Sequence, residues 1–142
     1  MKVATAVVDT NVLLDFWVFE DPRAVPLRAA IESGALGAWR SGAVVDELSD
    51  VLARPAFGLA NERRCEILRL WDRLARPVAR VMPAPWSCSD PRDQMFLDLA
   101  CSVRADWLIT RDKALLKLAR RVHGSGLNIG EPARVVHGVV HG

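Results

Sequence analysis

The chain has 142 residues, of which 51% are hydrophobic and 25% are charged, as in a folded globular domain and unlike a disordered segment. The formal net charge is only +2, and no apolar run approaches the roughly 18 residues that a membrane-spanning helix needs. The first residues, Met1 to Asp9, lack the length and cleavage pattern of a signal peptide. We therefore expect a single domain over residues 1–142 that is cytoplasmic and has no membrane contact.

Apolar periodicity and turn residues predict alternating strands and helices in the first half of the chain. An apolar, β-branched run over residues 3–8 ends at Asp9 and predicts a buried parallel strand. Pro22 follows Asp21 at the start of a helix, where proline is tolerated. The other predicted elements are helices over residues 10–16, 22–33, 41–52 and 61–74, with Asn61 as the N-cap of the last, and a strand over residues 36–39.

The second half of the chain continues this alternation. Its predicted elements are strands over residues 78–81 and 107–110 and near 128–129, and helices over residues 90–104 and 113–122. Strands that alternate with helices predict an α/β sandwich around a mostly parallel sheet. No repeat or long linker interrupts the pattern, as expected for one domain.

Cysteine and histidine residues do not suggest a metal cage. The three cysteines contain no CxxC pair, so neither a zinc site nor a disulfide framework is expected. His137 and His141 have the i, i+4 spacing of a metal-binding pair. Because glycines flank them near the end of the chain, we expect a solvated tail there instead.

Two aspartates follow predicted strands. Asp9 ends the first strand, and Asp112 comes shortly after the strand over residues 107–110. Binding crevices of open α/β sheets lie beyond the carboxyl ends of the strands, so both side chains could reach one crevice. Alternatively, each aspartate could cap the helix that follows it, since Asp is a preferred N-cap residue.

Glu47 lies within the apolar stripe of its predicted helix. It comes three residues after Val44 and four before Val51, on the side that should face the core. Asp46 and Asp50 fall on the outer face of the same helix. A carboxylate that faces inward is costly unless a partner compensates its charge. That partner could be a metal ion or, alternatively, an arginine.

Asp93 repeats this pattern in the helix that begins near residue 90. It comes three residues before Phe96, on the inward stripe, whereas Asp98 points away. The segment from Asp90 to Asp93 also resembles a capping box. Capping is therefore the alternative for this segment, and it suits Asp90 better than Asp93.

Four carboxylates that face one crevice would repel each other strongly if nothing neutralised them. The predicted set is Asp9, Glu47, Asp93 and Asp112. A hard divalent cation, Mg²⁺ or Mn²⁺, prefers such oxygen ligands, and it can polarise a phosphoryl group and activate water. No P-loop, GxGxxG motif or Ser/His or Cys/His pair is evident, so the residues favour metal-assisted hydrolysis of a phosphodiester.

Four sequence blocks carry a resemblance to a known family. They are Val8 to Leu14, Asp46 to Leu52, Asp90 to Ala100 and Ala105 to Leu116. In this order and at these spacings they resemble the PIN-domain family, and in particular its bacterial branch of toxin components of type II toxin–antitoxin systems. The resemblance covers nearly the whole chain.

The resemblance implies a PIN-like three-layer sandwich in which helices flank a mostly parallel sheet, with an Mg²⁺ or Mn²⁺ site. It implies an endoribonuclease that cleaves single-stranded RNA, forms homodimers or higher homo-oligomers, and is neutralised by a small antitoxin protein. Asn11 and Thr110 would orient metal ligands or water, and Asp90 would add charge at the rim. The alternative for Asn11 and Thr110 is backbone capping. The aromatic segment over residues 16–19 could be core, a dimer surface or a partner groove.

Basic residues near Asp112 could contact the RNA. Acidic residues outnumber basic ones over residues 1–60, and the reverse holds over residues 61–142. Phosphate contacts give sequence-independent, salt-dependent affinity, and a solvated helix face is the alternative for each basic stripe. The residues that we expect to bind nucleic acid are Arg111, Lys113, Lys117 and Arg120; a further basic stripe comprises Arg69, Arg73, Arg76 and Arg80.

Two other functions stay open on the sequence alone. A domain with this fold could lack catalysis and serve as an RNA- or protein-binding module, although all four acids are present. Alternatively, Asp9 could be the nucleophile of a haloacid dehalogenase-like phosphatase. The first motif of that family has a second acid two residues later, where this chain has Asn11.

Overall fold

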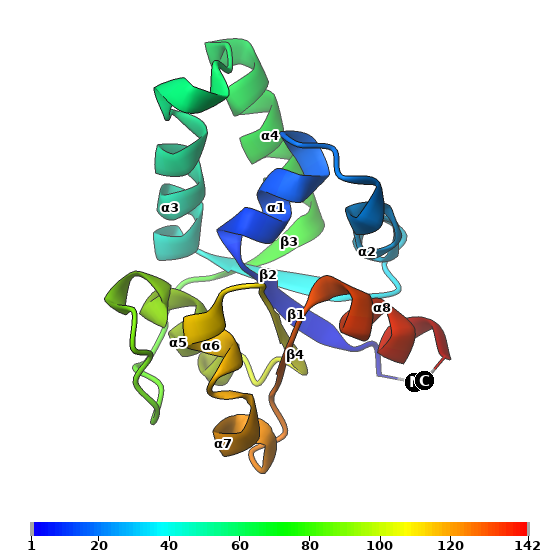
Figure 1. Cartoon of the computed structure of the whole chain (residues 1–142), viewed down its shortest axis with the longest axis vertical. Coiled ribbons are helices and arrows are strands. Elements are labelled where there is room, and N and C mark those ends of the chain that lie inside the picture. Colours follow the sequence, from blue (N-terminus) through cyan, green and yellow to red (C-terminus); the bar gives the residue numbers. More distant parts are fainter. Residues whose placement is uncertain (1, 142) are drawn as a thin grey trace.

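The computed structural model describes residues 2–141 and the side chains of residues 2–138. Five strands form one sheet in the order β3-β2-β1-β4-β5, and every neighbouring pair is parallel (Figure 1). The strands are β1 (Thr5–Val8), β2 (Gly37–Ser41), β3 (Ala75–Val78), β4 (Trp107–Ile109) and β5 (Asn128–Gly130). The predicted α/β fold with a parallel sheet is confirmed.

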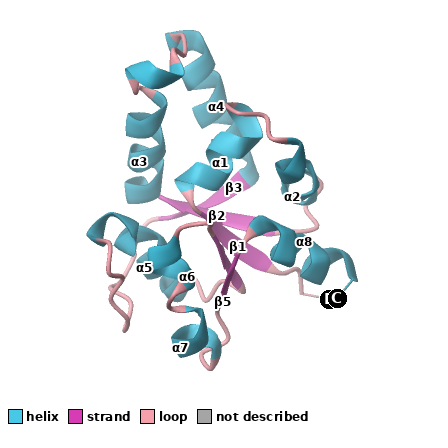
Figure 2. Cartoon of the chain, viewed as in Figure 1, coloured by secondary structure: helices cyan, strands magenta, loops and turns pink. Residues whose placement is uncertain are grey.

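Helices connect the strands and lie on both sides of the sheet (Figure 2). The α-helices are α1 (Thr10–Trp17), α2 (Val25–Glu32), α3 (Gly42–Leu52), α4 (Asn61–Leu74), α5 (Gln94–Ser102), α6 (Lys113–Leu116), α7 (Ala119–His123) and α8 (Pro132–His141). Short 3-10 helices precede α2, α4 and α5: η1 (Pro22–Ala24), η2 (Pro55–Phe57) and η3 (Pro91–Asp93). Over residues 2–141, no helix combines the length and apolar character needed to cross a membrane.

The strands alternate their side chains between two hydrophobic layers, because successive residues of a strand point to opposite faces. Ala6 and Val8 of β1 pack with side chains of α1, α2 and α4. Val7, between them, packs with side chains of α5, α6 and α7. Both faces of the sheet are therefore covered, which gives the three layers of the predicted sandwich.

Strand β3 lies earlier in the chain than the strand predicted over residues 78–81. Helix α4 passes directly into β3 at Ala75, without a connecting loop. Ala75 is buried and pairs with Ala38 of β2. Pro77 cannot donate a backbone hydrogen bond, and it is tolerated because β3 is an edge strand.

The helix predicted over residues 113–122 is divided into α6 and α7. The N–H of Leu118 donates to the carbonyl of Leu115 at 3.0 Å, a bond to the third residue back that tightens the turn. Leu115, Leu118 and Val122 are all buried. The tighter turn thus keeps these three side chains in the core. Apolar periodicity alone does not reveal that the helix is divided at this turn.

The solvated tail predicted around His137 is instead part of α8. Val135 is fully buried, and the Arg134 guanidinium lies over the Trp107 ring at 5.3 Å from its centroid. These contacts hold α8 against β4 and stabilise a helix that the flanking glycines disfavour. The side chain of His141, the other histidine of the predicted pair, lies outside the described residues.

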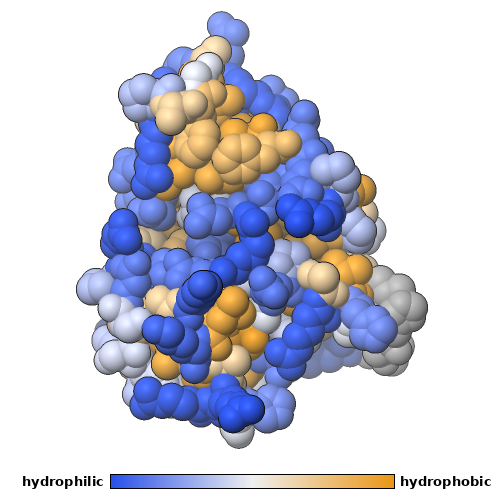
Figure 3. All heavy atoms as spheres, viewed as in Figure 1, coloured by the Kyte–Doolittle hydropathy of each residue, from blue (hydrophilic) through white to orange (hydrophobic). Residues whose placement is uncertain are grey.

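The aromatic segment over residues 16–19 is divided between core and surface. Phe16 and Trp17 are buried, whereas Phe19 is 57% exposed and its ring lies beside that of Phe57, with centroids 5.8 Å apart. Figure 3 shows hydrophobic side chains gathered on the face where α1, α3 and α4 lie in Figure 1, with hydrophilic side chains across the middle of that face. The segment is therefore core up to Trp17 and surface at Phe19.

Candidate metal centre

The strand order reverses between β1 and β4. From β1 the chain proceeds through β2 to β3 on one side, and β4 and β5 then add to the other side of β1. In open α/β sheets, ligands bind beyond the carboxyl ends of the strands at such a reversal. Asp9 follows β1 and Thr110 follows β4, so the topology itself brings these two side chains to the reversal point.

Asp9 is held from the neighbouring strand. Its N–H donates to the carbonyl of Ile109 at 3.0 Å, and its Oδ2 accepts a hydrogen bond from the Thr110 hydroxyl at 2.7 Å. The side chain makes no capping hydrogen bond to α1, so the capping alternative does not describe it. Burial raises the pKa of Asp9, and the hydrogen bond from Thr110 offsets part of that rise.

Thr110 is fully buried and connects two acids. Besides donating to Asp9, its Oγ1 accepts a hydrogen bond from the backbone N–H of Asp112 at 2.9 Å. One hydroxyl therefore fixes both the Asp9 carboxylate and the start of the loop that carries Asp112. These contacts are those that a residue orienting metal ligands would need.

Asp90 and Asp93, in the turn before α5, have different roles. Asp90 Oδ1 accepts a hydrogen bond from the N–H of Arg92 at 3.0 Å, so Asp90 caps η3. Asp93 makes no capping hydrogen bond and is only 8% exposed. Its Oδ2 is buried and has no hydrogen-bond partner among the described residues. Burial, with the Asp112 carboxyl beside it, raises the pKa of Asp93 to about 7.

Three carboxylates form the closest group. One oxygen each of Asp90, Asp93 and Asp112 lies within 4.8 Å of the others. Asp112 also caps α6, because its Oδ1 accepts a hydrogen bond from the N–H of Ala114 at 2.8 Å. Capping and membership of the acidic group are therefore compatible for Asp112. Asp90, expected at the rim, is part of this closest group.

Glu47 approaches from α3. Ser41 caps this helix, with its Oγ accepting from the N–H of Val44 at 3.4 Å, and the buried Val44 and Leu48 fix the side of α3 that faces the sheet. Glu47 is half-buried, and Asp46 is exposed, as the periodicity predicts. No ion pair in the described part of the chain includes Glu47, so the arginine alternative is not observed.

A cavity of about 150 Å³ brings these groups together. The charged side chains that line it are Asp9, Glu47, Asp90, Arg92, Asp93 and Asp112. Asn11 also lines the cavity and is exposed. The four acids of the predicted set thus meet in one cavity, with Asp9 and Glu47 outside the closest group of three.

The comparison with protein families identifies the type of domain. A family model described as PIN domain matches residues 5–114. The chain belongs to the PIN-domain family. The comparison with curated proteins finds no match. PIN domains are in general nucleases, which are hydrolases, and they use divalent metals. The dehalogenase-like phosphatase alternative is therefore excluded.

The acidic cavity of this PIN domain fits a divalent cation. Carboxylate oxygens are the ligands that Mg²⁺ and Mn²⁺ prefer. The buried Asp93 Oδ2, which has no partner among the described residues, is an atom that such a cation would satisfy. The raised pKa of Asp93 reflects a negative charge that its neighbours disfavour and that a cation would stabilise.

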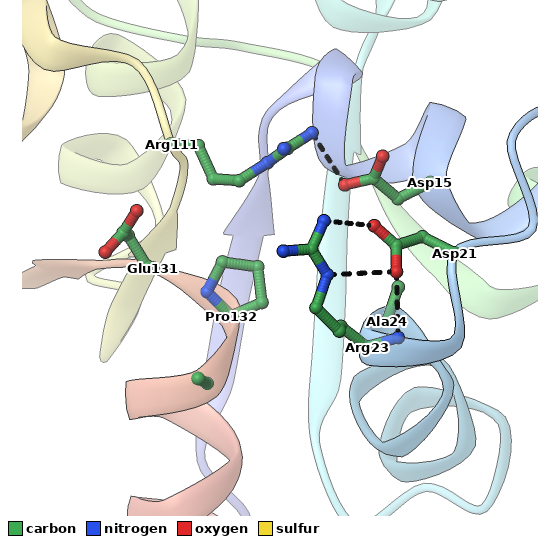
Figure 4. Close-up of a pocket in the computed structure, with 8 residues that line it drawn as sticks. Asp15, Asp21, Arg23, Ala24, Arg111, Glu131 and Pro132 are labelled. Carbon is green, nitrogen blue, oxygen red and sulfur yellow. Dashed lines mark hydrogen bonds and ion pairs between the residues drawn. The ribbon is translucent and has the colours of Figure 1, made fainter.

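The basic residues around Asp112 lie in different settings. Lys113, Lys117 and Arg120 are exposed, and the division between α6 and α7 separates the last from the other two. Arg111 does not line the acidic cavity. Its Nη2 pairs instead with Oδ2 of the buried Asp15 at 2.7 Å (Figure 4). Arg111 therefore connects the loop after β4 to α1.

One charged residue of the cavity was missed by the sequence prediction. The sequence pattern indicates only that Arg92 belongs to the capped segment from Asp90 to Asp93. Its presence in the cavity depends on η3, which turns Arg92 back onto Asp90. The available sequence signal was the Asp-Pro-Arg order, which predicts a capped turn that returns the arginine to the aspartate.

Proposed function

We propose that this PIN domain is a metal-dependent endoribonuclease that cleaves the phosphodiester bonds of single-stranded RNA by metal-activated water. The observation that carries the proposal is Asp93. This carboxyl is buried, has an oxygen without a partner among the described residues, and lies within 4.8 Å of two other carboxyls. Burial of such a group is costly without a compensating charge, so the site favours a bound cation.

In this proposal Asp9, Glu47, Asp93 and Asp112 hold Mg²⁺ or Mn²⁺. When bound, such a cation acts as a Lewis acid on the phosphodiester and lowers the pKa of water, which is the chemistry that hydrolysis requires. The membership of Asp90 in the closest acidic group supports a larger role for it than charge at the rim.

Hydrogen bonds within the chain orient the proposed ligands. Thr110 holds the Asp9 carboxylate in a fixed orientation, and the cap of α6 fixes one oxygen of Asp112. Asn11, exposed at the cavity, is suited to orient water or substrate. A bound cation would favour the charged form of Asp93, whose pKa burial raises in its absence.

The RNA would approach over the residues that follow β4. Lys113, Lys117 and Arg120 are exposed and carry no ion pair in the described part of the chain. Arg111 is 43% exposed while it pairs with Asp15, so part of its guanidinium stays accessible to a phosphate. Phosphate contacts of this kind position a strand without reading its sequence.

A toxin role, neutralised by a small antitoxin protein, is part of the same proposal. Its support is the resemblance of the four sequence blocks to the toxin branch of the family. The same resemblance leads us to propose a homodimer or higher homo-oligomer. The mass of the protein in solution tests this oligomeric state.

Cleavage of a labelled single-stranded RNA tests the proposed activity. The purified protein is compared with Asp9→Asn, each with Mn²⁺, with Mg²⁺ and with EDTA. We expect wild-type cleavage that needs the metal, and its loss in Asp9→Asn with the fold retained. Cleavage by Asp9→Asn at the wild-type rate would refute the metal-site assignment. No cleavage by a protein that still binds RNA or a partner would favour the non-catalytic binding module.

A further inference from the structure

The tripeptide Asp-Pro-Arg occurs twice in the chain with the same local structure. Asp21 and Asp90 each cap a 3-10 helix that has proline at its first position. In each case the aspartate accepts a hydrogen bond from the backbone N–H of the arginine two residues later, at 2.9 and 3.0 Å. Arg23 and Arg92 then return their side chains to the same carboxylates.

The side-chain contacts of the two arginines agree closely. The Nε atom lies 3.2 Å from Oδ1 in both pairs, and Nη2 lies 2.9 Å from Oδ2 for Arg23 and 3.1 Å for Arg92. The side chains of Arg23 and Arg92 are 86% and 85% exposed. The chain therefore contains an internal control: two arginines in nearly identical local settings.

The surroundings of the two arginines differ. Arg23 lines a cavity of about 180 Å³ together with Asp15, Arg111 and Glu131, on the side of the loop after β4 that Figure 4 shows. Arg92 lines the acidic cavity with the proposed metal ligands. Among the described residues, Arg92 is the only lysine or arginine that lines that cavity.

A nucleic acid that enters this cavity brings negative charge to a place already rich in carboxylates. A bound divalent cation compensates part of that charge, and a guanidinium at the rim compensates more. A guanidinium suits this task because its planar set of N–H groups can hold a carboxylate along one edge and a phosphate along another.

Arg92 has this arrangement. Its Nε and Nη2 atoms donate to Asp90, whereas its Nη1 amino group has no hydrogen bond within the part of the chain that the structure describes. The pair is exposed, and exposed ion pairs contribute little to stability. Stability of the fold is therefore a poor explanation for an arginine at this position.

We propose that Arg92 binds a backbone phosphate of the single-stranded nucleic acid at the rim of the metal centre, with Asp90 orienting its guanidinium. The inference rests on the proposed function, since it takes the acidic cavity as the place where the phosphodiester binds. Arg92 is thus a substrate-binding residue, and Arg23, which makes the same contacts with its aspartate but does not line the acidic cavity, is the matched comparison.

Binding of a fluorescently labelled single-stranded RNA, measured by anisotropy over a series of salt concentrations, tests this assignment. The proteins are wild type, Arg92→Ala, Arg92→Lys and the matched control Arg23→Ala. Titrations are made in EDTA and in Ca²⁺, a cation with the same preference for oxygen ligands, and a gel checks that the RNA stays intact. Isothermal titration with Mn²⁺ alone measures the metal affinity of each protein.

We expect Arg92→Ala to weaken RNA binding about tenfold and to make the salt slope shallower by about 0.7, the value for one phosphate of a single strand. Arg92→Lys should keep the salt slope and recover part of the affinity, since it retains the charge but not the planar set of donors. Arg23→Ala should bind RNA as wild type does. Mn²⁺ affinity should not fall in Arg92→Ala, because no proposed ligand is lost.

Equal RNA affinities for Arg92→Ala and Arg23→Ala would overturn the inference. So would a parallel loss of Mn²⁺ and RNA affinity in Arg92→Ala, which would mean that Arg92 serves only to hold Asp90. A wild-type protein that binds no RNA overturns it too, and the Mn²⁺ titration then reports separately on the metal centre. If wild type binds RNA through Arg92 but does not cleave it with Mn²⁺, the proposed nuclease activity fails and the phosphate site stands.

Discussion

The hydroxyl of Thr110 donates a hydrogen bond to Oδ2 of Asp9 at 2.7 Å, across the neighbouring carboxyl ends of β1 and β4. The Thr110 hydroxyl oxygen in turn accepts a hydrogen bond from the backbone N–H of Asp112 at 2.9 Å. Because Thr110 is fully buried, water cannot replace either bond without a rearrangement of the core. The relative position of two proposed metal ligands therefore depends on one side chain.

Thr110→Val removes this hydroxyl and keeps the shape of the side chain. We expect Mn²⁺ affinity and RNA cleavage to fall about 10- to 100-fold, as when a residue that orients a metal ligand is lost. Stability should fall by about 1–3 kcal/mol, because the Asp112 N–H loses its acceptor. Thr110→Ser keeps the hydroxyl and is the control. A valine variant that binds Mn²⁺ as tightly as wild type would contradict the orienting role.

The raised pKa of Asp93 predicts how the metal-free protein responds to pH. The pKa in the folded protein, about 7, lies above the ordinary value of 3.8, so the folded state keeps a proton that the unfolded chain has released. The stabilisation from this group is therefore complete below about pH 4 and is lost as the pH rises toward 7. We expect the contribution of Asp93 to the free energy of unfolding in EDTA to decline over this range by up to about 4 kcal/mol.

Asp93→Asn supplies the comparison. Asparagine stays neutral, so the variant should lack this decline and should be more stable than wild type at pH 8 in EDTA. Urea unfolding of both proteins at several pH values measures the difference. Mn²⁺ should stabilise wild type at pH 8 more than it stabilises Asp93→Asn, which lacks one proposed ligand. Parallel pH profiles for the two proteins would show that Asp93 is ionised in the metal-free fold.

Glu47 and its neighbour Asp46 offer a matched pair of acids on α3. Glu47 lines the acidic cavity, whereas Asp46 is exposed on the outer face of the helix. Glu47→Gln should reduce cleavage at least about tenfold by removing a ligand charge. Asp46→Asn should change cleavage less than about twofold, since surface substitutions have small effects. Equal activities of the two variants would remove Glu47 from the site.

Much of the fold could be predicted because its elements follow local patterns. The short apolar, β-branched run before Asp9 is typical of a strand buried on both faces, and Val44, Leu48 and Val51 define one side of a helix at a period of 3.6. The parts that could not be predicted depend on contacts between distant residues. Packing of Val135 in the core and of Arg134 on Trp107 stabilises α8, in a segment whose glycines and position near the end of the chain favour a solvated tail.

The candidate site also has a part that local sequence patterns predict and a part that depends on contacts between distant residues. The inward position of Glu47 follows from the periodicity of α3, which ties it to apolar neighbours of the same helix. The sequence predicts Asp93 inside a helix, but Asp93 is the last residue of η3 and the N-cap of α5, so its inward position also depends on that turn. The closeness of Asp90 to Asp112 depends on how η3 and the loop after β4 are placed in space. Sequence spacing carries no information on that distance, so the place of Asp90 within the closest acidic group could not be foreseen.

Arg111 and Asp15 provide a test that separates RNA binding from structural support. Arg111 pairs with the buried Asp15 at 2.7 Å while 43% of its side chain stays exposed. Arg111→Ala should destabilise the protein by about 1–3 kcal/mol, because it leaves a buried carboxyl without its partner. It should also make the salt slope of RNA binding shallower by about 0.7.

The control for this prediction is Asp15→Asn, which removes the partner's charge and keeps the arginine. This variant should bind RNA with the wild-type salt slope. If Arg111→Ala loses stability but keeps the wild-type salt slope, Arg111 is a structural partner of Asp15 and makes no contact with RNA.

Two pairs of exposed basic residues allow a test of where RNA binds. They are Lys113 and Lys117, after β4, and Arg69 and Arg73, on α4. Lys113 directly follows Asp112, which lines the acidic cavity, whereas the two arginines lie on α4, none of whose residues lines it. Lys113→Ala/Lys117→Ala should reduce the salt slope by about 1.4, the value for two phosphates of a single strand. Arg69→Ala/Arg73→Ala removes the same charge and should leave the slope unchanged, because no residue of α4 lines the acidic cavity. Equal effects of the two double variants would mean that RNA senses only the overall charge, and that the lysines after β4 are a solvated helix face.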